Sequence, residues 1–144
     1  MQIVERSALV THTAAQMFAL VNDVARYPEF LPWCVGARVE DTAEGKRIAT
    51  LKVERGVLRT EFTTRNTLVQ DAQIRMQLMH GPFRNLNGEW RFEAIGTRGS
   101  KVHFQVEFEF KNRLTAHAFN GVFEAICGTI VDAFVKRAQK IYPG

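Results

Sequence analysis

Apolar residues recur at every second position through the middle of the chain and at every third or fourth position near its end. Between about residues 35 and 110 the period is two. The most regular stretch has apolar residues at Val102, Phe104, Val106, Phe108 and Phe110, and every residue between them is polar. Strict alternation is typical of a strand with one face on a core and the other in water. We therefore expect six successive strands here, paired as an antiparallel meander.

The start of the chain predicts a strand followed by two short helices. Residues 2–11 carry apolar side chains on both faces, which favours a central position for this strand in the sheet. Thr13 and Gln16 have the spacing of a capping box, which marks the start of a helix. A second short helical turn is expected over residues 24–27. It should end there because Pro28 disfavours helical geometry in the residue before it.

The last part of the chain predicts one long helix over residues 114–141. Its apolar positions are Phe119, Val122, Phe123, Ile126, Ile130, Ala133, Phe134, Ala138 and Ile141. This spacing by threes and fours places them on one face of a helix. At 1.5 Å per residue the helix is about 42 Å long, whereas a compact domain of this size is roughly 37 Å across. The helix should therefore cross the whole molecule and pack on the apolar face of the sheet.

This order of elements indicates an α+β protein with a helix-grip fold, as a single domain over residues 1–144. We expect a strongly curved antiparallel sheet of about seven strands, wrapped round the long C-terminal helix, with two short helices after the first strand. Eleven phenylalanines and two tryptophans favour a filled interior. Small residues of the helix, such as Gly121 and Gly128, favour a cavity instead. Both alternatives remain open.

Composition and charge add limits to this picture. Of the 144 residues, 46% are hydrophobic and 24% are charged, which argues against disorder and fibrous repeats. The formal charge of +4 indicates a mild preference for anionic partners, such as RNA or a phospholipid surface. Cys34 and Cys127 are far apart in the sequence and are expected to be reduced thiols. Since no apolar run reaches the roughly 20 residues of a membrane span, we expect a cytoplasmic protein.

The sequence offers no group of residues arranged for catalysis or metal binding. The four histidines form no HExxH or Cys/His spacing, and there is no GxSxG, P-loop or GxGxxG motif. We therefore expect no catalytic residue, no metal and no required cofactor. The inward strand positions are aliphatic or aromatic, so we expect no titratable side chain to face the interior.

Two segments hold more large apolar side chains than a surface connection needs. Residues 27–34 are made rigid by two prolines, and they form either a plug at one end of the core or the mouth of a pocket. Residues 80–92 form a sharp turn that leads into a strand with aromatic residues on its inner face. Gly88 in this strand either leaves room for a ligand or relieves the bend of the sheet.

Four motifs resemble those of one family. They are DVxxYPxFLPWC at residues 23–34, TTRNxL at 63–68, GPFxxLxGxWxF at 81–92 and VxFxxxFEFxNxL at 102–114. Together they resemble the ubiquinone-binding, polyketide-cyclase-like family of the START-related superfamily. The resemblance implies a helix-grip fold with a hydrophobic tunnel. It also implies one of two functions. Eukaryotic members bind ubiquinone and support respiration, whereas bacterial members of the RatA type bind the large ribosomal subunit and block its joining to the small one. A cyclase- or dehydrase-like enzyme acting on a polyketide-type substrate, which the family's label implies, is kept as a minor alternative.

The first hypothesis is non-catalytic binding of ubiquinone or a similar prenyl lipid between the sheet and the helix, in support of respiratory quinone function. Each buried CH₂ group contributes about 0.8 kcal/mol to such binding. The expected cavity lining consists of Tyr27, Phe30, Leu31, Trp33, Phe62, Phe83, Trp90, Phe104, Phe108, Phe119, Val122, Phe123 and Ile126. The alternatives for a polar partner of the quinone ring are Tyr27, Arg65, Asn66 and His80.

The second hypothesis is binding of the large ribosomal subunit, for which phosphate contacts need mobile cations. The candidates are Lys136, Arg137 and Lys140 at the helix end, and Arg55 and Arg59 beside Val57 and Leu58 in a hairpin. The same hairpin is an alternative contact with a membrane surface, with its two apolar residues entering the lipid. That contact would place the protein peripherally at the inner membrane. The simpler alternatives are an ordinary hairpin and compensation of the helix dipole.

Overall fold

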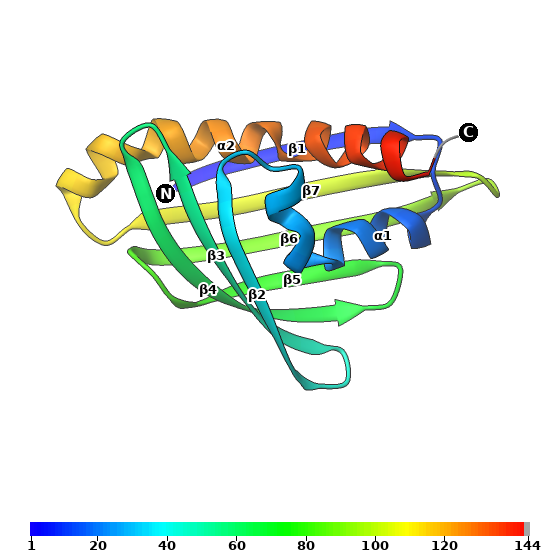
Figure 1. Ribbon diagram of the computed structural model, residues 1–144, viewed down its shortest axis with the longest axis horizontal. Helices are drawn as coiled ribbons and strands as arrows, with labels where there is room; N and C mark the ends of the chain where they lie inside the picture. Colours follow the sequence, from blue (N-terminus) through cyan, green and yellow to red (C-terminus); the bar gives the residue numbers. More distant parts are fainter. Residues whose placement is uncertain (143–144) are drawn as a thin grey trace.

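The computed structural model describes residues 1–142, as one seven-stranded antiparallel sheet with a long helix along one side (Figure 1). In chain order the elements are β1 (Gln2–Val10), α1 (Ala14–Asn22), the 3₁₀ helix η1 (Val24–Glu29), β2 (Cys34–Ala43), β3 (Lys46–Arg55), β4 (Leu58–Val69), β5 (Gln73–His80), β6 (Phe83–Ile95), β7 (Gly99–Phe110) and α2 (Arg113–Ile141). The order and types of the elements are those that the sequence predicts.

The strands follow the order β1-β7-β6-β5-β4-β3-β2 across the sheet. Strands β2 to β7 form the predicted meander, and β1 pairs with β7, where Gln2 lies opposite Phe108. The prediction that the first strand is central is wrong, because β1 is an edge strand. Its outward side chains Ile3 and Leu9 are exposed. The apolar residues on both faces of β1 therefore reflect one packed face and one face open to solvent.

The two short helices pack at one end of the core. The capping box of α1 is confirmed, because the Thr13 side chain accepts a hydrogen bond from the backbone N–H of Gln16, and the Gln16 side chain accepts one from that of Thr13. The second helix runs further than predicted, since η1 continues through Pro28 to Glu29. The segment is a 3₁₀ helix, whose φ angles match the one that the proline ring fixes, although the missing N–H of Pro28 removes one hydrogen bond. This extension places Glu29 near α2.

Helix α2 crosses the molecule along β1 and β7 (Figure 1). Its start is capped by Asn112, whose side-chain oxygen accepts a hydrogen bond of 2.7 Å from the backbone N–H of Leu114. No side chain of residues 113–122 is buried. The buried side chains of α2 all lie further along: Phe123, Ile126, Cys127, Val131, Phe134 and Ala138. The sheet therefore holds the second half of the helix far more than the first.

Candidate functional site

Aromatic side chains fill most of the space between the sheet and α2. The ring of Phe134, which is fully buried, lies 5.3 Å from that of Trp90 on β6 and 5.4 Å from that of Tyr27 on η1. Nearer the start of α2, the ring of Phe123 lies 4.7 Å from that of Phe108 on β7. Edge-to-face contacts of this kind stabilise a core beyond the area that they bury. Most of the interior is thus occupied by the protein's own rings.

A void of about 90 Å³ remains among these rings. Pockets for drug-sized ligands have volumes of about 300–1,000 Å³, so this void is smaller than such a pocket. Two buried polar side chains line it, Thr64 and Asn66, and the Thr64 hydroxyl donates a hydrogen bond of 2.7 Å to Asn66 Oδ1. A prenyl quinone would enter only if the rings or the helix moved apart.

Two titratable side chains line the void, Tyr27 and Cys127. Burial raises the pKa of the Cys127 thiol to about 12, and the nearby Glu124 carboxylate adds to the increase. Burial likewise raises the pKa of the Tyr27 hydroxyl, which donates a hydrogen bond to the backbone oxygen of Val21. Both groups keep their protons at neutral pH, so the lining supplies no general base there.

The predicted cavity residues divide between the void and its surroundings. Those that line the void are Tyr27, Trp33, Phe62, Trp90, Phe104, Phe123 and Ile126. Those that lie elsewhere are Phe30 and Leu31 on an outer groove, Phe83 and Phe108 in the buried aromatic cluster, and Phe119 and Val122 on the half-buried part of α2. The inward faces of the strands were therefore assigned correctly, although the space between them is mostly filled.

Only two of the four polar partners predicted for a quinone ring lie at the void. Tyr27 and Asn66 line it. The predictions for Arg65 and His80 are wrong, because both side chains are exposed, one on the outer face of β4 and the other at the β5–β6 turn. The room expected at Gly88 is taken by Met76, whose terminal methyl would lie 2.6 Å from a Cβ atom there.

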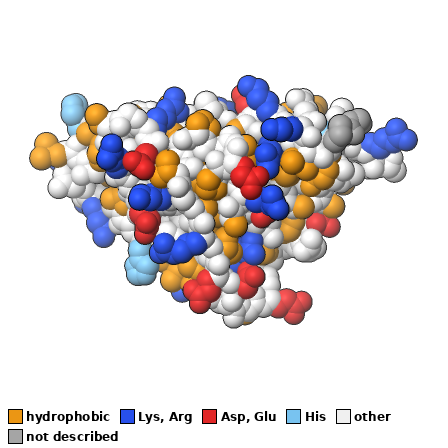
Figure 2. Space-filling view, in the orientation of Figure 1, with side chains coloured by type: hydrophobic (Ala, Val, Ile, Leu, Met, Phe, Trp, Pro, Cys, Tyr) orange, Lys and Arg blue, Asp and Glu red, His pale blue; other side chains and the backbone are white. Residues whose placement is uncertain are grey.

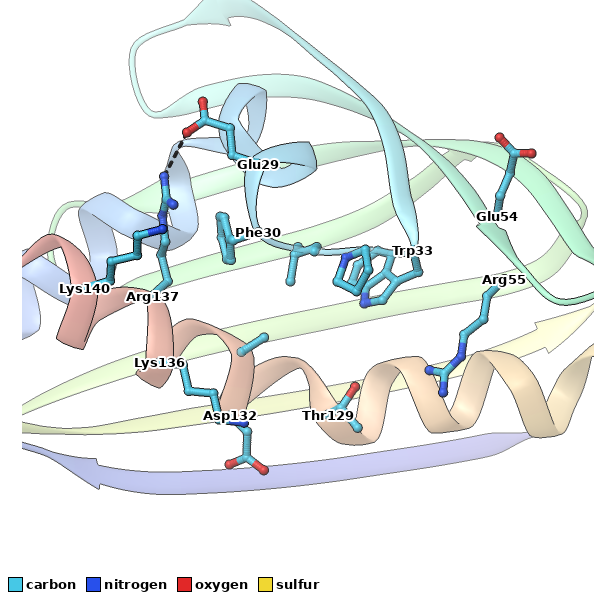
Figure 3. Close-up of a pocket in the computed structure, with 13 residues that line it drawn as sticks. Glu29, Phe30, Trp33, Glu54, Arg55, Thr129, Asp132, Lys136, Arg137 and Lys140 are labelled. Carbon is cyan, nitrogen blue, oxygen red and sulfur yellow. Dashed lines mark hydrogen bonds and ion pairs between the residues drawn. The ribbon is translucent and has the colours of Figure 1, made fainter.

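A groove of about 770 Å³ lies on the surface, over the C-terminal half of α2 (Figure 3). Its walls are the connection between η1 and β2, the end of β3, and successive turns of α2. Figure 3 shows Phe30 and Trp33 between these walls, with Lys136 and Arg137 rising from the helix and Arg55 reaching in from β3. The groove therefore joins an apolar wall to a charged rim.

Seven charged side chains line the groove: Arg55, Lys136, Arg137, Lys140, Glu29, Glu54 and Asp132. Arg137 is held in place, since its Nη2 lies 2.9 Å from Glu29 Oε1 and its Cζ lies 4.8 Å from the centre of the Phe30 ring. Its side chain is only 10% exposed. Among residues 1–142, the other three cations have no carboxylate oxygen within 4.0 Å. These three are therefore available to an anionic partner.

Trp33 separates the groove from the void. Its side chain is buried and lines both hollows. The backbone on either side is fixed, because the N–H of Glu54 donates a hydrogen bond of 2.9 Å to the Trp33 carbonyl, and that of Cys34 donates one of 2.9 Å to Leu31. Removal of the Trp33 side chain should therefore connect the two hollows.

The β3–β4 hairpin is only partly the contact surface that the sequence predicts. Val57 at its tip is 75% exposed. The prediction for Leu58 is wrong, because this side chain is fully buried and shares the inward face of β4 with Phe62. Arg59 is exposed, and its Nε lies 3.6 Å from a carboxylate oxygen of Glu54. Val57 is thus the apolar residue of this tip that a partner would meet.

The carboxylates of the groove and the exposed start of α2 were not predicted from the sequence. Glu29 reaches Arg137 across 108 positions of sequence, and no local pattern signals such a pair. Leu114 begins the predicted helix, but the apolar stripe alone does not show that its side chain lies outside the core, where it is 81% exposed. Within the described part of the chain, no three His, Cys, Asp or Glu side chains are grouped as metal ligands.

Helix α2 is long and apolar enough to span a membrane, with a mean hydropathy of 1.4 in its most apolar stretch. Core helices can have the same composition, so this is weak evidence for a span. Only 28% of that stretch is buried inside the fold, however. Burial in the core therefore does not account for all of its apolar surface.

Comparison with known proteins supports the sequence-based resemblance. Residues 10–135 match the family described as "Polyketide cyclase / dehydrase and lipid transport". The chain is 42% identical over 139 residues to the ribosome association toxin RatA of Pseudomonas aeruginosa, a match that covers 96% of each chain. It is 30% identical over 141 residues to the mitochondrial coenzyme Q-binding protein COQ10 homolog B of Xenopus laevis, covering 94% of this chain and 57% of that protein.

The fold is shared with solved structures of low sequence identity. The ZhuI aromatase/cyclase from Streptomyces sp. R1128 superposes with a TM-score of 0.86, at 16% identity, over 99% of this chain and 96% of that one. This confirms the helix-grip fold that the order of elements predicts, and the START type that the resemblance implies for it. At such low identity the likeness concerns the fold alone.

Proposed function

Because the chain belongs to the polyketide cyclase/dehydrase and lipid transport family, in which it lies nearer to the ribosome association toxins than to the coenzyme Q-binding proteins, we propose that it acts by binding the ribosome. The single observation that carries the proposal is the 42% identity to RatA over 96% of both chains. As the sequence resemblance implies, its target is the large subunit, and binding there blocks joining of the small one.

The groove over α2 supports this proposal as the contact site. The groove is lined by three cations that are not paired with a carboxylate among the described residues: Lys136, Lys140 and Arg55. Ribosomal RNA presents closely spaced phosphates, and the attraction between phosphates and free cations supplies much of the affinity of nucleic-acid binding. The pair between Arg137 and Glu29 holds α2 against the end of η1 and so fixes one side of the groove.

The interior supports a non-catalytic function. The residues around the void supply no group that is ionised at neutral pH, since Tyr27 and Cys127 keep their protons. Without a base or an acid of suitable pKa, cyclisation or dehydration of a substrate has no proton acceptor there. The functional surface is therefore expected outside the core.

Co-sedimentation with purified large subunits tests the proposal. The wild-type protein should pellet with the subunits at low salt and less at moderate salt. A Lys136→Glu/Lys140→Glu variant should bind more weakly, and the slope of log K against log salt should decrease by about 1.5, as expected for the loss of two phosphate contacts. The matched control is Lys46→Glu/Lys101→Glu, which makes the same change of charge at exposed positions outside the groove.

The outcomes separate the parts of this proposal. Binding that is lost in the groove variant and kept in the control supports the groove as the contact. Equal loss in both variants shows that net charge matters and the groove does not. If the wild-type protein fails to pellet at either salt concentration, the ribosome proposal is wrong. An assay of subunit joining then checks whether bound protein prevents formation of the complete ribosome.

The relationship to a coenzyme Q-binding protein supports a second candidate function, binding of a hydrophobic small molecule such as a prenyl quinone. The void is lined mostly by apolar side chains, and Asn66 and Tyr27 offer polar contacts. At about 90 Å³ it must widen to hold such a ligand. Lipid extraction of protein purified from quinone-producing cells, followed by mass spectrometry, tests this function, and consistent absence of quinone would contradict it.

A further inference from the structure

The groove over α2 offers a partner more than free cations. It has a volume of about 770 Å³, and one of its sides is α2 from Thr129 to Lys140. The opposite side is formed by residues 29–33 and by the end of β3. Ala133 lies midway along the helix side, and its small side chain takes up little of the hollow. The groove therefore has room for a group larger than a phosphate.

Part of the apolar wall is open to such a group. Pro32 is exposed, and Phe30 and Ala133 are half-buried. Leu31 and Trp33 are buried and complete the wall. An apolar wall beside free cations suits single-stranded RNA, because its unstacked bases pack on aromatic and planar side chains while its phosphates contact cations.

Arg137 adds a fixed planar group to this wall. Its Cζ lies 4.8 Å from the centre of the Phe30 ring, and its Nη2 donates a hydrogen bond of 2.9 Å to Glu29 Oε1. Guanidinium planes are among the groups on which unstacked RNA bases rest. Because Arg137 is held in place by its own neighbours, it loses little conformational entropy when a base packs against it.

The groove also contains one unpaired carboxylate. Asp132 is exposed on α2, and within residues 1–142 no side-chain nitrogen of a Lys, Arg or His lies within 4.0 Å of its oxygens. The other two carboxylates are paired, Glu29 with Arg137 and Glu54 with Arg59. Asp132 would weaken a contact made with phosphates alone. It suits a base that carries an amino group, because a carboxylate accepts hydrogen bonds from that group.

The three free cations lie on both sides of this hollow. Lys136 and Lys140 are one helical turn apart, which places them about 6 Å from each other along the axis of α2. Arg55 reaches the groove from β3 (Figure 3). Figure 2 shows basic and acidic side chains close together over the second half of α2 and the neighbouring η1. Cations are thus available for the phosphates before and after a bound base.

We propose that the groove binds an unpaired nucleotide in the RNA of the large ribosomal subunit. The base packs against Phe30, Pro32 and Arg137. Its amino group donates a hydrogen bond to Asp132, and the free cations contact the neighbouring phosphates. This inference rests on the ribosome proposal and specifies the RNA that the groove selects. A single strand fits, whereas the bases of a duplex are stacked inside the helix and do not reach the wall.

Fluorescence anisotropy with three short probes of equal length tests the base contact. The probes are oligocytidylate, oligouridylate and a ribose–phosphate chain without bases, so all three carry the same phosphates. The wild-type protein should bind oligocytidylate about fivefold or more tightly than the chain without bases, because stacking is lost in the latter. It should bind oligouridylate more weakly than oligocytidylate, since uracil has a carbonyl where cytosine has its amino group.

An Asp132→Ala variant separates a base contact from simple electrostatics. If the groove contacts only phosphates, removal of this negative charge strengthens RNA binding. We expect the opposite, a loss of about fivefold for oligocytidylate, together with loss of the preference over oligouridylate. The matched control is Glu124→Ala, which removes the same charge at an exposed position of α2 outside the groove. It should bind as tightly as the wild type or more tightly. Ala is the best helix former, so both variants should fold.

The base site is overturned if the wild-type protein binds all three probes equally, or if Asp132→Ala binds oligocytidylate as tightly as the wild type or more tightly. Co-sedimentation of the same proteins with large subunits distinguishes this failure from that of the ribosome proposal. Wild-type protein that pellets with the subunits and does not discriminate among the probes contradicts the base site alone. Wild-type protein that does not pellet contradicts the ribosome proposal itself. Pelleting that Asp132→Ala leaves unchanged assigns the groove to another contact, such as a ribosomal protein, and likewise overturns the base site.

Discussion

The two halves of α2 differ in what holds them. From Phe123 onward the helix lies on the sheet, and Phe134 is fully buried among aromatic rings. Before Phe123 no side chain of the helix is buried, and Asn112 caps the start. One continuous apolar helix therefore serves two purposes. Its second half closes the core and carries the groove, whereas its first half presents apolar surface to the surroundings.

This difference shows why the apolar pattern of a helix does not by itself identify a core or a ligand cavity. The aromatic residues that the sequence suggested as a cavity lining mostly touch one another, and about 90 Å³ is left between them. The larger hollow is the surface groove, which carries the three free cations. Function is therefore expected on the exterior of this protein.

The largest expected effect is on stability, and it contrasts the two halves directly. Phe134→Ala should lower the free energy of unfolding by about 3–5 kcal/mol, because it leaves a hole among packed rings. Leu114→Ala should change it by about 0.5 kcal/mol or less, since that side chain is exposed. Urea unfolding of both variants measures the difference, and comparable losses would contradict the division of the helix.

The second prediction concerns pH and tests the burial of Cys127. The unfolded thiol releases its proton near its usual pKa of 9.0, whereas the folded thiol keeps it up to about 12. Stability should therefore fall as pH rises between these values, by up to about 1.4 kcal/mol per pH unit from this group. Urea unfolding at pH 8 and pH 10 measures this fall, and the free energy of unfolding should decrease less between the two pH values in the Cys127→Ala variant than in the wild-type protein. An unchanged decline would show that other groups cause it.

A smaller effect is expected at the cap of α2. Asn112→Ala should cost about 1 kcal/mol, because two backbone N–H groups lose their acceptor. The loss should appear as faster amide hydrogen exchange in residues 113–117, with little change after Phe123. Thr13→Ala in α1 is the comparison, since that cap belongs to a helix packed on the core. Faster exchange along the whole of α2 would mean that its halves unfold together.

Much of this fold is predictable from local patterns. Alternation located the strands of the meander, and the spacing of Thr13 and Gln16 located the start of α1. The position of β1 at an edge was not predictable in this way, because pairing depends on which strands meet in space. The burial of Leu58 was predictable, since it shares its period of two with Phe62 on the inward face.

The candidate site was less predictable than the fold. The cations at Lys136 and Lys140 were identified from their position near the helix end, and the structure places both on the groove. The pairing of Arg137 with Glu29 could not be predicted, because 108 positions separate the two residues and the contact depends on how η1 packs on α2. The volume left between the sheet and the helix could not be predicted either, since it depends on how rings such as those of Trp90 and Phe104, whose centres lie 4.5 Å apart, pack together.

One measurement tests the exterior site most directly. Because both native cysteines are buried with raised thiol pKa values, a single cysteine introduced as Lys136→Cys can be labelled selectively with a photo-crosslinker, and Lys46→Cys serves as the control. Mixed with large ribosomal subunits and irradiated, the protein labelled at position 136 should form crosslinks to ribosomal RNA, and the protein labelled at position 46 should not. Crosslinks from position 46 alone, or from neither position while the protein still co-sediments, would contradict the account.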